Sequence, residues 1–322
     1  MAPKLLLTGG TGYIGGSVLH TLASTHPDWA ITVLLRRTPA NFASTYPHIK
    51  VIQGDYDSAG IISAAAEDAN IVMHCGNSDH SGSLNAIIAG LERRSSPGYL
   101  IHLSGTGIVS DWSSPTHLGR LNPKVWSDAS ASDLQEIRNL PNTALHRNTE
   151  VILHQTIRES TEKINVAIMC PPDIYGRGKG LFKTQSALIP LCVKESKTLG
   201  RVFLVGKARN DGKETQQYFG ENGYHFASTQ EWSHLDFSTA VGKLLSKHGV
   251  VADSEPVQVD LERLDAMANF PGFPKLARYL YASNSRTRAD KAASLWGYEG
   301  EAPGLMEALE EDVLDAIREE RS

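Results

Sequence analysis

Three glycines near the start of the chain have the spacing of a loop that binds phosphate groups. They lie in LLLTGGTGYIG at residues 5–15, between a short apolar run and an amphipathic stretch. Gly9 permits a tight turn, Gly12 lets the backbone approach a pyrophosphate, and Gly15 lets the helix lie close to a sheet. The helix N-terminus supplies free N–H groups and a partial positive charge. A tight turn without a ligand is the alternative, but the context favours dinucleotide binding. Further residues expected to line this loop are Thr11, Tyr13 and Ile14.

Two arginines end the second apolar run and indicate which dinucleotide is bound. An NAD site usually has an acidic residue near this point, for the ribose hydroxyls. Arg36 and Arg37 stand there instead, and a guanidinium group suits a 2′-phosphate. We therefore expect NADP rather than NAD, with Arg36 and Arg37 among the cofactor-binding residues and Arg36 as the favoured contact. The alternative is that both are solvated charges at an exposed strand end.

Two further strand ends carry candidate cofactor contacts. Asp55 follows the third run, where it could accept a hydrogen bond from the adenine amino group or cap the next helix. Cys75 and Gly76 follow the fourth run, and their small size would let the backbone pass beside the nicotinamide ribose. His74 in the same run is interpreted as a buried core residue.

The elements that must position these residues alternate between strand and helix. Near-continuous apolar runs, typical of strands covered on both faces, occur at Lys4–Leu7, Ile31–Leu35, Ile49–Ile52, Ile71–Met73, Tyr99–Leu103 and Ile164–Met169. Amphipathic stretches between them are Tyr13–Ser24, Ser58–Glu67, Ser83–Arg93 and Thr149–Thr161. This alternation predicts an α/β fold, a doubly wound parallel Rossmann sheet whose strands all end at one edge, where ligands bind.

The pattern changes after Pro171, at a glycine-rich loop. Residues 1–175 are predicted to form the NAD(P)-binding Rossmann domain, and residues 176–322 a smaller substrate-binding region with segments that return to it. The elements expected in this second region are helices at Ser186–Ser196, Trp232–Lys247 and Met306–Arg318 and a strand at Arg201–Val205.

Composition excludes several classes of protein. The 322 residues carry a net charge of −5, which argues against nucleic acid and against a basic membrane-binding face. No apolar stretch is long enough to span a bilayer, and the leucines at the start are too few for a signal sequence. The three cysteines lie far apart, so we expect neither disulfides nor a metal site, and a cytoplasmic protein. A small-molecule substrate is the expected partner, and the sequence leaves the oligomeric state open, a homodimer included.

Several motifs together resemble the extended and atypical short-chain dehydrogenase/reductase superfamily, its NAD(P)-dependent epimerase/dehydratase and NmrA-like group. They are TGGTGYIGG at 8–16, GD at 54–55, IHLSGTGIV at 101–109, PPDIYGRGKG at 171–180 and SNSRTRADKA at 283–292. The resemblance implies cofactor binding in the N-terminal domain and substrate binding in the C-terminal part.

The resemblance also implies catalytic positions, and two of them are changed. In the superfamily a Ser or Thr binds the substrate oxygen, and Ser104 and Thr106 match this station. The Tyr of a YxxxK pair delivers the proton, but here His146 stands for the Tyr and Glu150 for the Lys. An imidazole can act as acid or base near neutrality, held by Glu150 one turn later, or Arg147 could supply the lysine's charge. The alternative is that the proton relay has been lost.

Some remaining segments bear on the substrate pocket. The superfamily's late HVxD-type segment is expected to be missing between about Asn210 and Glu221, because residues 232–236 have the pattern of a helix with Ser233 as its cap. Adjacent residues in Ser78-Asp79-His80 cannot form a relay among themselves, and we interpret them as a loop. The residues of this part that we expect at the substrate are His80 and Tyr175.

Three functions are compatible with these residues. The first is an NADP-dependent oxidoreductase acting on a carbonyl or alcohol of a small organic molecule, with Thr106, Ser104 and His146 as its catalytic residues. The second is a non-redox isomerase, cyclase or lyase on the same fold. The third is an NmrA-like redox sensor that binds the dinucleotide without catalysis. The missing Tyr and Lys favour the second and third, and the hydroxyl station favours the first two.

Overall fold

The computed structural model describes residues 2–205, 220–268, 273–300 and 302–320. Within them, seven parallel strands form the central sheet in the order β3-β2-β1-β4-β5-β7-β9. Their bounds are β1 Lys4–Thr8, β2 Ala30–Leu35, β3 Lys50–Gln53, β4 Ile71–His74, β5 Gly98–Leu103, β7 Ile164–Cys170 and β9 Tyr224–Phe226. The order reverses between β1 and β4, and such a switch point is where ligands bind in open α/β sheets. The predicted Rossmann fold is confirmed.

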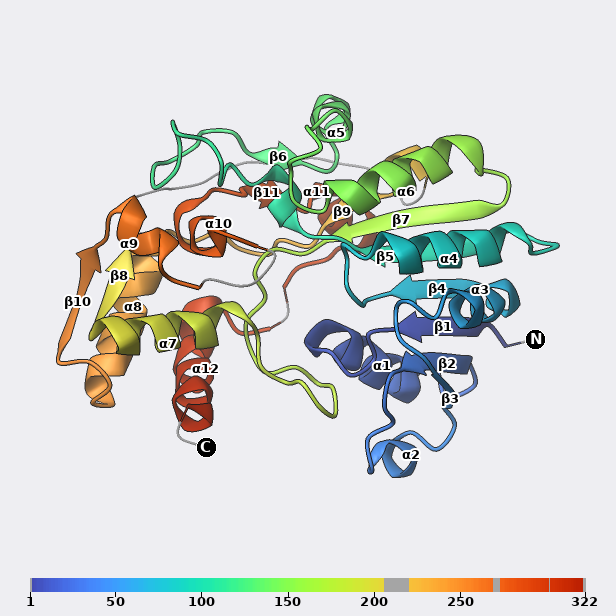
Figure 1. The fold of residues 1–322 in the computed structure, drawn as a ribbon, viewed down its shortest axis with the longest axis horizontal. Helices are drawn as coiled ribbons and strands as arrows, with labels where there is room; N and C mark the ends of the chain where they lie inside the picture. Colours follow the sequence, from blue (N-terminus) through green and yellow to red (C-terminus); the bar gives the residue numbers. More distant parts are fainter. Residues whose placement is uncertain (1, 206–219, 269–272, 301, 321–322) are drawn as a thin grey trace.

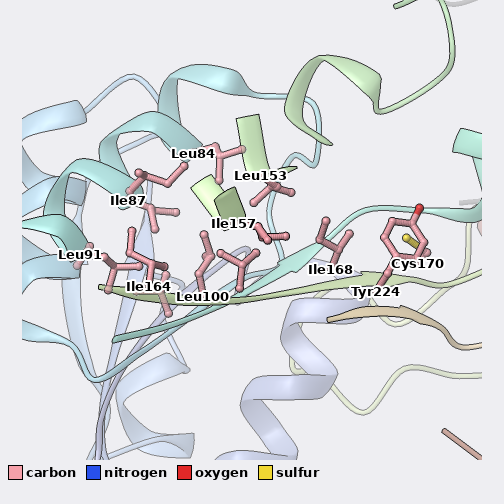
Figure 2. Packing of buried hydrophobic residues seen from close by; sticks show 14 of the residues in the cluster. Leu84, Ile87, Leu91, Leu100, Leu153, Ile157, Ile164, Ile168, Cys170 and Tyr224 are labelled. Carbon is pink, nitrogen blue, oxygen red and sulfur yellow. The ribbon is translucent and has the colours of Figure 1, made fainter. Parts of the chain in front are cut away.

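Helices cover the first face of the sheet over most of its width. They are α3 (Ala59–Asp68), α4 (Ser81–Glu92) and α6 (Arg147–Glu159). Apolar side chains at helical spacing on α4 and α6 meet alternate residues of β5 and β7, because successive strand residues face opposite sides. Figure 2 shows this packing for Leu84, Ile87, Leu100, Leu153 and Ile168 among others.

The second face is covered unevenly. The helices α1 (Tyr13–Thr25) and α2 (Phe42–Thr45) pack on β1 and β2 through a separate apolar cluster. Farther along the sheet, β5, β7 and β9 border an open cavity of about 470 Å³ on this face, lined almost wholly by apolar side chains, Ile101 and Met169 among them. Helices α1 and α11 (Asp290–Trp296) contribute Ile14 and Trp296 to the lining of this cavity, so helices flank the sheet on this face too.

A second group of elements lies beyond the carboxyl ends of the strands (Figure 1). It comprises α7 (Leu188–Leu199), β8 (Arg201–Leu204), α8 (His234–Lys247), β10 (Asp253–Gln258), α9 (Leu261–Asp265), α10 (Leu276–Ala282) and α12 (Leu305–Glu319). One apolar cluster joins them, with α12 packed against α7 and α8. The predicted helix cap is confirmed, since Ser233 Oγ accepts from the backbone of Asp236 at 3.1 Å.

Short elements connect the two groups. They are η1 (Thr106–Val109), β6 (Trp126–Ser127), α5 (Ala131–Arg138), η2 (Gly220–Asn222), β11 (Thr287–Arg288) and α11 (Asp290–Trp296). The strand β11 pairs with β6, and α11 packs on β9. The segment in which the HVxD motif was expected to be missing falls mainly outside the described residues, but β9 directly after it does return the chain to the sheet.

Candidate functional site

The glycine turn has the backbone geometry that a phosphate-binding loop requires. Gly9 has a φ of +75°, and a Cβ there would collide with the carbonyl of Cys75. A Cβ on Gly15 would collide with the carbonyl of Gly9, while the Gly12 N–H donates to that carbonyl at 2.8 Å. Helix α1 begins after Gly12 with no side-chain cap and no acidic residue in its first turn. Its first N–H groups are thus left for an anionic ligand, so this cradle fits a dinucleotide pyrophosphate.

Side chains around the turn have partners of their own. The Tyr13 hydroxyl donates to the carbonyls of Tyr175 at 3.0 Å and Gly176 at 2.7 Å, and burial raises the pKa of Tyr13 to about 12. Ile14 lines the open cavity on the sheet face. The two Tyr13 hydrogen bonds hold α1 against the loop after β7, while Thr11 lies half-buried in the turn itself.

The adenosine side of the expected site is open to solvent. Arg36 and Arg37 are both exposed directly after β2. Asp55 Oδ1 accepts from the Ser58 hydroxyl at 2.8 Å and from the Asp57 backbone at 3.1 Å, and the Ser58 bond holds the Asp55 pKa below its usual range. Asp55 is not the cap of α3, because the N-cap residue is Ser58. Its contacts stabilise the turn that leads into the helix.

The residues after β4 are held by close packing. The Cys75 side chain lies near Gly15, and burial raises its pKa to about 12. At Gly76 a Cβ would collide with the hydroxyl of Tyr56. Packing against Tyr56 therefore requires a glycine at position 76. The cofactor contact expected of Gly76 stays a prediction.

The two hydroxyls of the expected station have different surroundings. Ser104 is buried, and its Oγ donates to Glu150 Oε1 at 2.6 Å. The Tyr224 hydroxyl donates to the same oxygen at 3.1 Å, so Ser104 serves a buried network around Glu150. Thr106 begins η1, where its N–H donates to the carbonyl of Pro171 at 2.9 Å, and Gly105 and Gly107 flank it. Both residues are buried, and Ser104 Oγ is engaged by Glu150.

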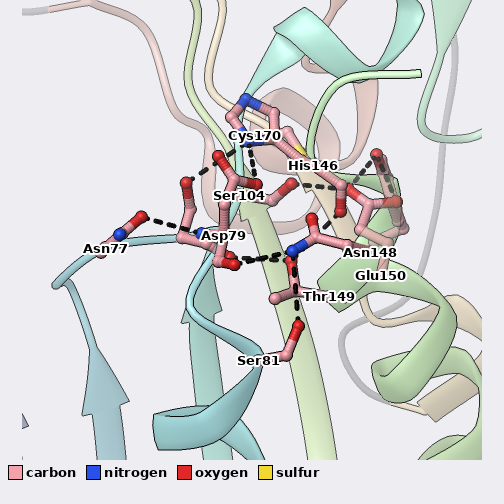
Figure 3. Close-up of polar contacts among 11 residues, drawn as sticks. Asn77, Asp79, Ser81, Ser104, His146, Asn148, Thr149, Glu150 and Cys170 are labelled. Carbon is pink, nitrogen blue, oxygen red and sulfur yellow. Dashed lines mark hydrogen bonds and ion pairs between the residues drawn. The ribbon is translucent and has the colours of Figure 1, made fainter. Parts of the chain in front are cut away.

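His146 lies directly before α6, and its ring extends toward Asp79 (Figure 3). Its φ of +59° is unusual for a residue other than glycine, and such backbone is often found at functional sites. Its Nδ1 lies 3.0 Å from Asp79 Oδ1. Its Nε2 lies 2.9 Å and 3.2 Å from the points that a Cβ would occupy on Gly105 and Gly107. The imidazole is thus held by a carboxylate on one side and faces the turn around Thr106 on the other.

Two sequence-based expectations about His146 are wrong. Glu150 does not hold the imidazole, because its oxygens face Ser104 and Tyr224 inside the core. Arg147 does not replace the lysine's charge, because Nε donates to the carbonyl of Leu140 at 2.9 Å and Nη2 to that of Arg138 at 2.7 Å. The carboxylate partner is Asp79, which the sequence analysis assigned to a loop.

Contacts between the β4–α4 loop and α6 explain how Asp79 is positioned. The Asn148 side chain donates to the carbonyl of Asp79 at 2.7 Å, and Thr149 Oγ1 donates to that of Ser78 at 2.7 Å. The Asp79 N–H donates to the Asn77 side chain at 3.1 Å. Asp79 and His146 are 67 positions apart in the sequence. The one signal in the sequence that could have suggested their pairing is that neighbouring parallel strands end at the same edge of the sheet.

The two expected substrate residues have different outcomes. His80 begins α4, where its Nδ1 accepts from the N–H of Ser83 at 3.0 Å and its Nε2 lies 3.2 Å from Asp57 Oδ1. Both ring nitrogens thus have partners within the protein, which hold His80 at the start of α4. Tyr175 lines a cavity, and its hydroxyl donates to the carbonyl of Pro303 at 3.1 Å.

This cavity, of about 160 Å³, lies between the loop after β7 and the C-terminal elements. Residues with polar groups predominate in its lining, including Asp173, Gln230, His234 and Tyr279. Desolvation lowers the pKa of the half-buried His234 and raises that of Asp173, although Asp173 still reaches solvent at the rim. Shifted pKa values in a cleft are typical of functional sites, so this is the candidate substrate cavity.

The SNSRTRADKA motif holds the wall of the cavity in place. The Asn284 N–H donates to Asp111 Oδ1 at 2.7 Å, and Arg286 Nε donates to Glu231 at 2.8 Å. Farther along, the Lys291 N–H donates to the buried Asp128 at 3.0 Å. The described residues contain no group of three or more ligands suited to a metal ion, and none of their helices is long and apolar enough to cross a membrane.

Comparisons with known proteins agree with this fold. Residues 5–93 match the model of the NAD dependent epimerase/dehydratase family. The Oxidase ucsJ of Acremonium sp is 24% identical over 343 aligned positions, which cover 96% of both chains. A dTDP-glucose 4,6-dehydratase of Mycobacterium tuberculosis is 35% identical, but over 81 residues, 24% of each chain.

Solved structures with the same fold align along nearly the whole chain. The yeast methylglyoxal/isovaleraldehyde reductase, complexed with NADPH, is 13% identical with a TM-score of 0.60 and 99% coverage of both chains. The UDP-glucose 4-epimerase of Thermotoga maritima is 13% identical with a TM-score of 0.58, covering 99% of this chain and 100% of that one. The protein therefore has the same fold as this reductase and this epimerase. The match to the NAD dependent epimerase/dehydratase family model lies within its N-terminal half.

Proposed function

We propose that this protein is an NADP-dependent oxidoreductase that acts on the carbonyl or alcohol group of a small organic molecule. The observation that carries the proposal is the His146 imidazole, held at Nδ1 by Asp79 with Nε2 facing the turn around Thr106. The glycine cradle and the exposed Arg36 support the cofactor part. The NADPH complex of a reductase with the same fold is consistent with it.

The residues divide the chemistry among them. The nicotinamide, when bound, supplies or accepts the hydride at the substrate carbon. In the reducing direction, Thr106 donates a hydrogen bond to the carbonyl oxygen, and His146 Nε2 gives that oxygen a proton. Asp79 fixes the imidazole's orientation and stabilises the imidazolium form, as a carboxylate does when it accepts from Nδ1–H. The proton returns to Nε2 when an alcohol is oxidised.

The direct test mixes the purified protein with NADPH and a panel of aldehydes and ketones while absorbance at 340 nm is followed. We expect oxidation of NADPH by at least one carbonyl compound, and a loss of turnover in His146→Phe with NADPH binding retained. Binding of NADPH without oxidation by any member of the panel contradicts the oxidoreductase. Full turnover in His146→Phe removes His146 from the mechanism.

A further inference from the structure

A tyrosine from the C-terminal region reaches the same turn as His146. The Tyr279 hydroxyl lies 3.0 Å from the point that a Cβ would occupy on Gly107, and His146 Nε2 lies 3.2 Å from that point. The two groups therefore converge beside Thr106 from different parts of the chain. Tyr279 also lines the candidate substrate cavity, so it stands where the cavity meets the turn.

We propose that Tyr279 is a further catalytic residue, whose hydroxyl donates a hydrogen bond to the substrate oxygen that His146 protonates. The proposal rests on the proposed oxidoreductase function. The family resemblance implies a tyrosine at the position that His146 occupies here, and Tyr279 brings a phenol to the site from α10. His146 then transfers the proton and Tyr279 donates the phenolic hydrogen bond, whereas in the family a single tyrosine is expected to supply both.

The environment of Tyr279 suits a donor rather than a base. Burial raises its pKa, and the carboxylates Asp173 and Asp79 raise it further, because a phenolate would be repelled by both. The hydroxyl therefore keeps its proton and can stabilise negative charge on a substrate oxygen. A donor fixed in place before the reaction is effective in this role, because it needs no reorganisation as the charge develops.

The helix α10 determines which of its tyrosines faces the turn. Tyr281 is buried in the C-terminal apolar cluster, where its ring packs edge-on against Phe203 at 4.9 Å between centroids. Residues two apart on a helix point in nearly opposite directions, so Tyr279 faces the turn at Gly107, with its ring beside Phe273. Among the described residues, the Tyr281 hydroxyl has no hydrogen-bond partner. Tyr281 is thus a matched control on the same helix.

The lining of the cavity beside Tyr279 favours a polar carbonyl compound as the substrate. It offers hydroxyl, amide and carboxyl groups, as at Ser228, Gln230 and Asp173. Glyceraldehyde and hydroxyacetone carry hydroxyl groups that can bond to these residues, whereas benzaldehyde and acetophenone are apolar apart from the carbonyl group.

The experiment compares Tyr279→Phe with Tyr281→Phe in the full chain, using these four carbonyl compounds and NADPH. We expect the wild type to prefer the two polar compounds. In Tyr279→Phe, kcat/KM should fall about 100-fold, the loss seen when one donor to a developing oxyanion is removed. NADPH affinity should not change, and Tyr281→Phe should keep wild-type kcat/KM. Wild-type kcat/KM in Tyr279→Phe overturns the inference.

A second measurement reports on the site without turnover. The ring resonances of His146 in a ¹H–¹³C NMR spectrum, assigned with His146→Phe, should shift in Tyr279→Phe and stay in place in Tyr281→Phe. Unmoved resonances in Tyr279→Phe overturn the inferred convergence. If the wild type oxidises no NADPH with any carbonyl compound, the proposed function itself fails. If the wild type is active and Tyr279→Phe is equally active, the proposed function stands and only the role of Tyr279 fails.

Discussion

Nδ1 of His146 lies 3.0 Å from Oδ1 of Asp79, although 67 positions separate the two residues in the chain. Asp79 follows β4 and His146 precedes α6, and both lie beside the carboxyl end of β5. The carboxylate can accept the Nδ1 proton, which leaves Nε2 to exchange a proton at the turn around Thr106. This pair is the feature on which the proposed chemistry depends.

Replacing Asp79 by Asn should reduce turnover while leaving cofactor binding intact. The neutral amide no longer stabilises the imidazolium, and it can favour the wrong tautomer of His146. We expect kcat to fall about 100-fold or more, with an unchanged Kd for NADPH measured by calorimetry. Asp57→Asn is the control, because Asp57 forms a comparable pair with His80 at 3.2 Å. Equal losses in the two variants would show that the Asp79 effect is structural.

Replacing Arg36 by Ala should weaken NADPH binding selectively. A hydrogen bond to a charged group contributes about 1.5–3 kcal/mol, which corresponds to about a 10- to 100-fold rise in Kd for NADPH. The affinity for NADH should change little, because NADH lacks the 2′-phosphate. Arg37→Ala is the control on the neighbouring exposed arginine. If both variants bind NADPH like the wild type, these arginines do not select the cofactor.

Two neighbouring residues of β5 should differ in their contribution to stability. Leu100 faces α4 and α6 and is fully buried, whereas Ile101 lines the open cavity on the other face. Leu100→Ala should lower the free energy of unfolding by about 2–5 kcal/mol, because it leaves a void in a closed core. Ile101→Ala should cost about 1 kcal/mol, since part of its side chain already meets solvent. Urea denaturation measures both, and a comparable loss in Ile101→Ala would mean that the second face is covered in solution.

Stability should fall as the pH drops below about 6.5. Burial lowers the pKa of His74 to about 4 and that of His102 to about 3, so both stay neutral in the folded chain. The unfolded chain takes up protons at these residues below its pKa of about 6.5, which favours unfolding between there and pH 4. We expect a loss of about 2 kcal/mol for each histidine by pH 5.

The pH effect can be checked by thermal unfolding between pH 7 and 5. His102→Leu should make the fall in Tm shallower, while His20→Gln on the surface should leave it unchanged. A fall in Tm that is identical in all three proteins would assign the pH dependence to other groups.

The local pattern of the sequence was sufficient to predict the Rossmann core. The predicted strand Ile164–Met169 is observed as Ile164–Cys170, and the helix Tyr13–Ser24 as Tyr13–Thr25. Such elements follow from apolar periodicity and from the glycines of the turn, which act over a few residues. Short elements such as β9 and α10 have too few residues to show a periodic pattern of apolar side chains. Their conformation depends on packing against the rest of the chain.

The sequence by itself therefore determined the sheet, the glycine cradle at Gly9 and the presence of His146 where a tyrosine is expected. Only the tertiary structure decided the partners of His146, because ion pairs and hydrogen bonds depend on distance in space and not along the chain. It turned Glu150 inward to Ser104 and brought Asp79 to the imidazole. It also carried Tyr279 from the C-terminal region to the turn beside Thr106, which no spacing in the sequence could show.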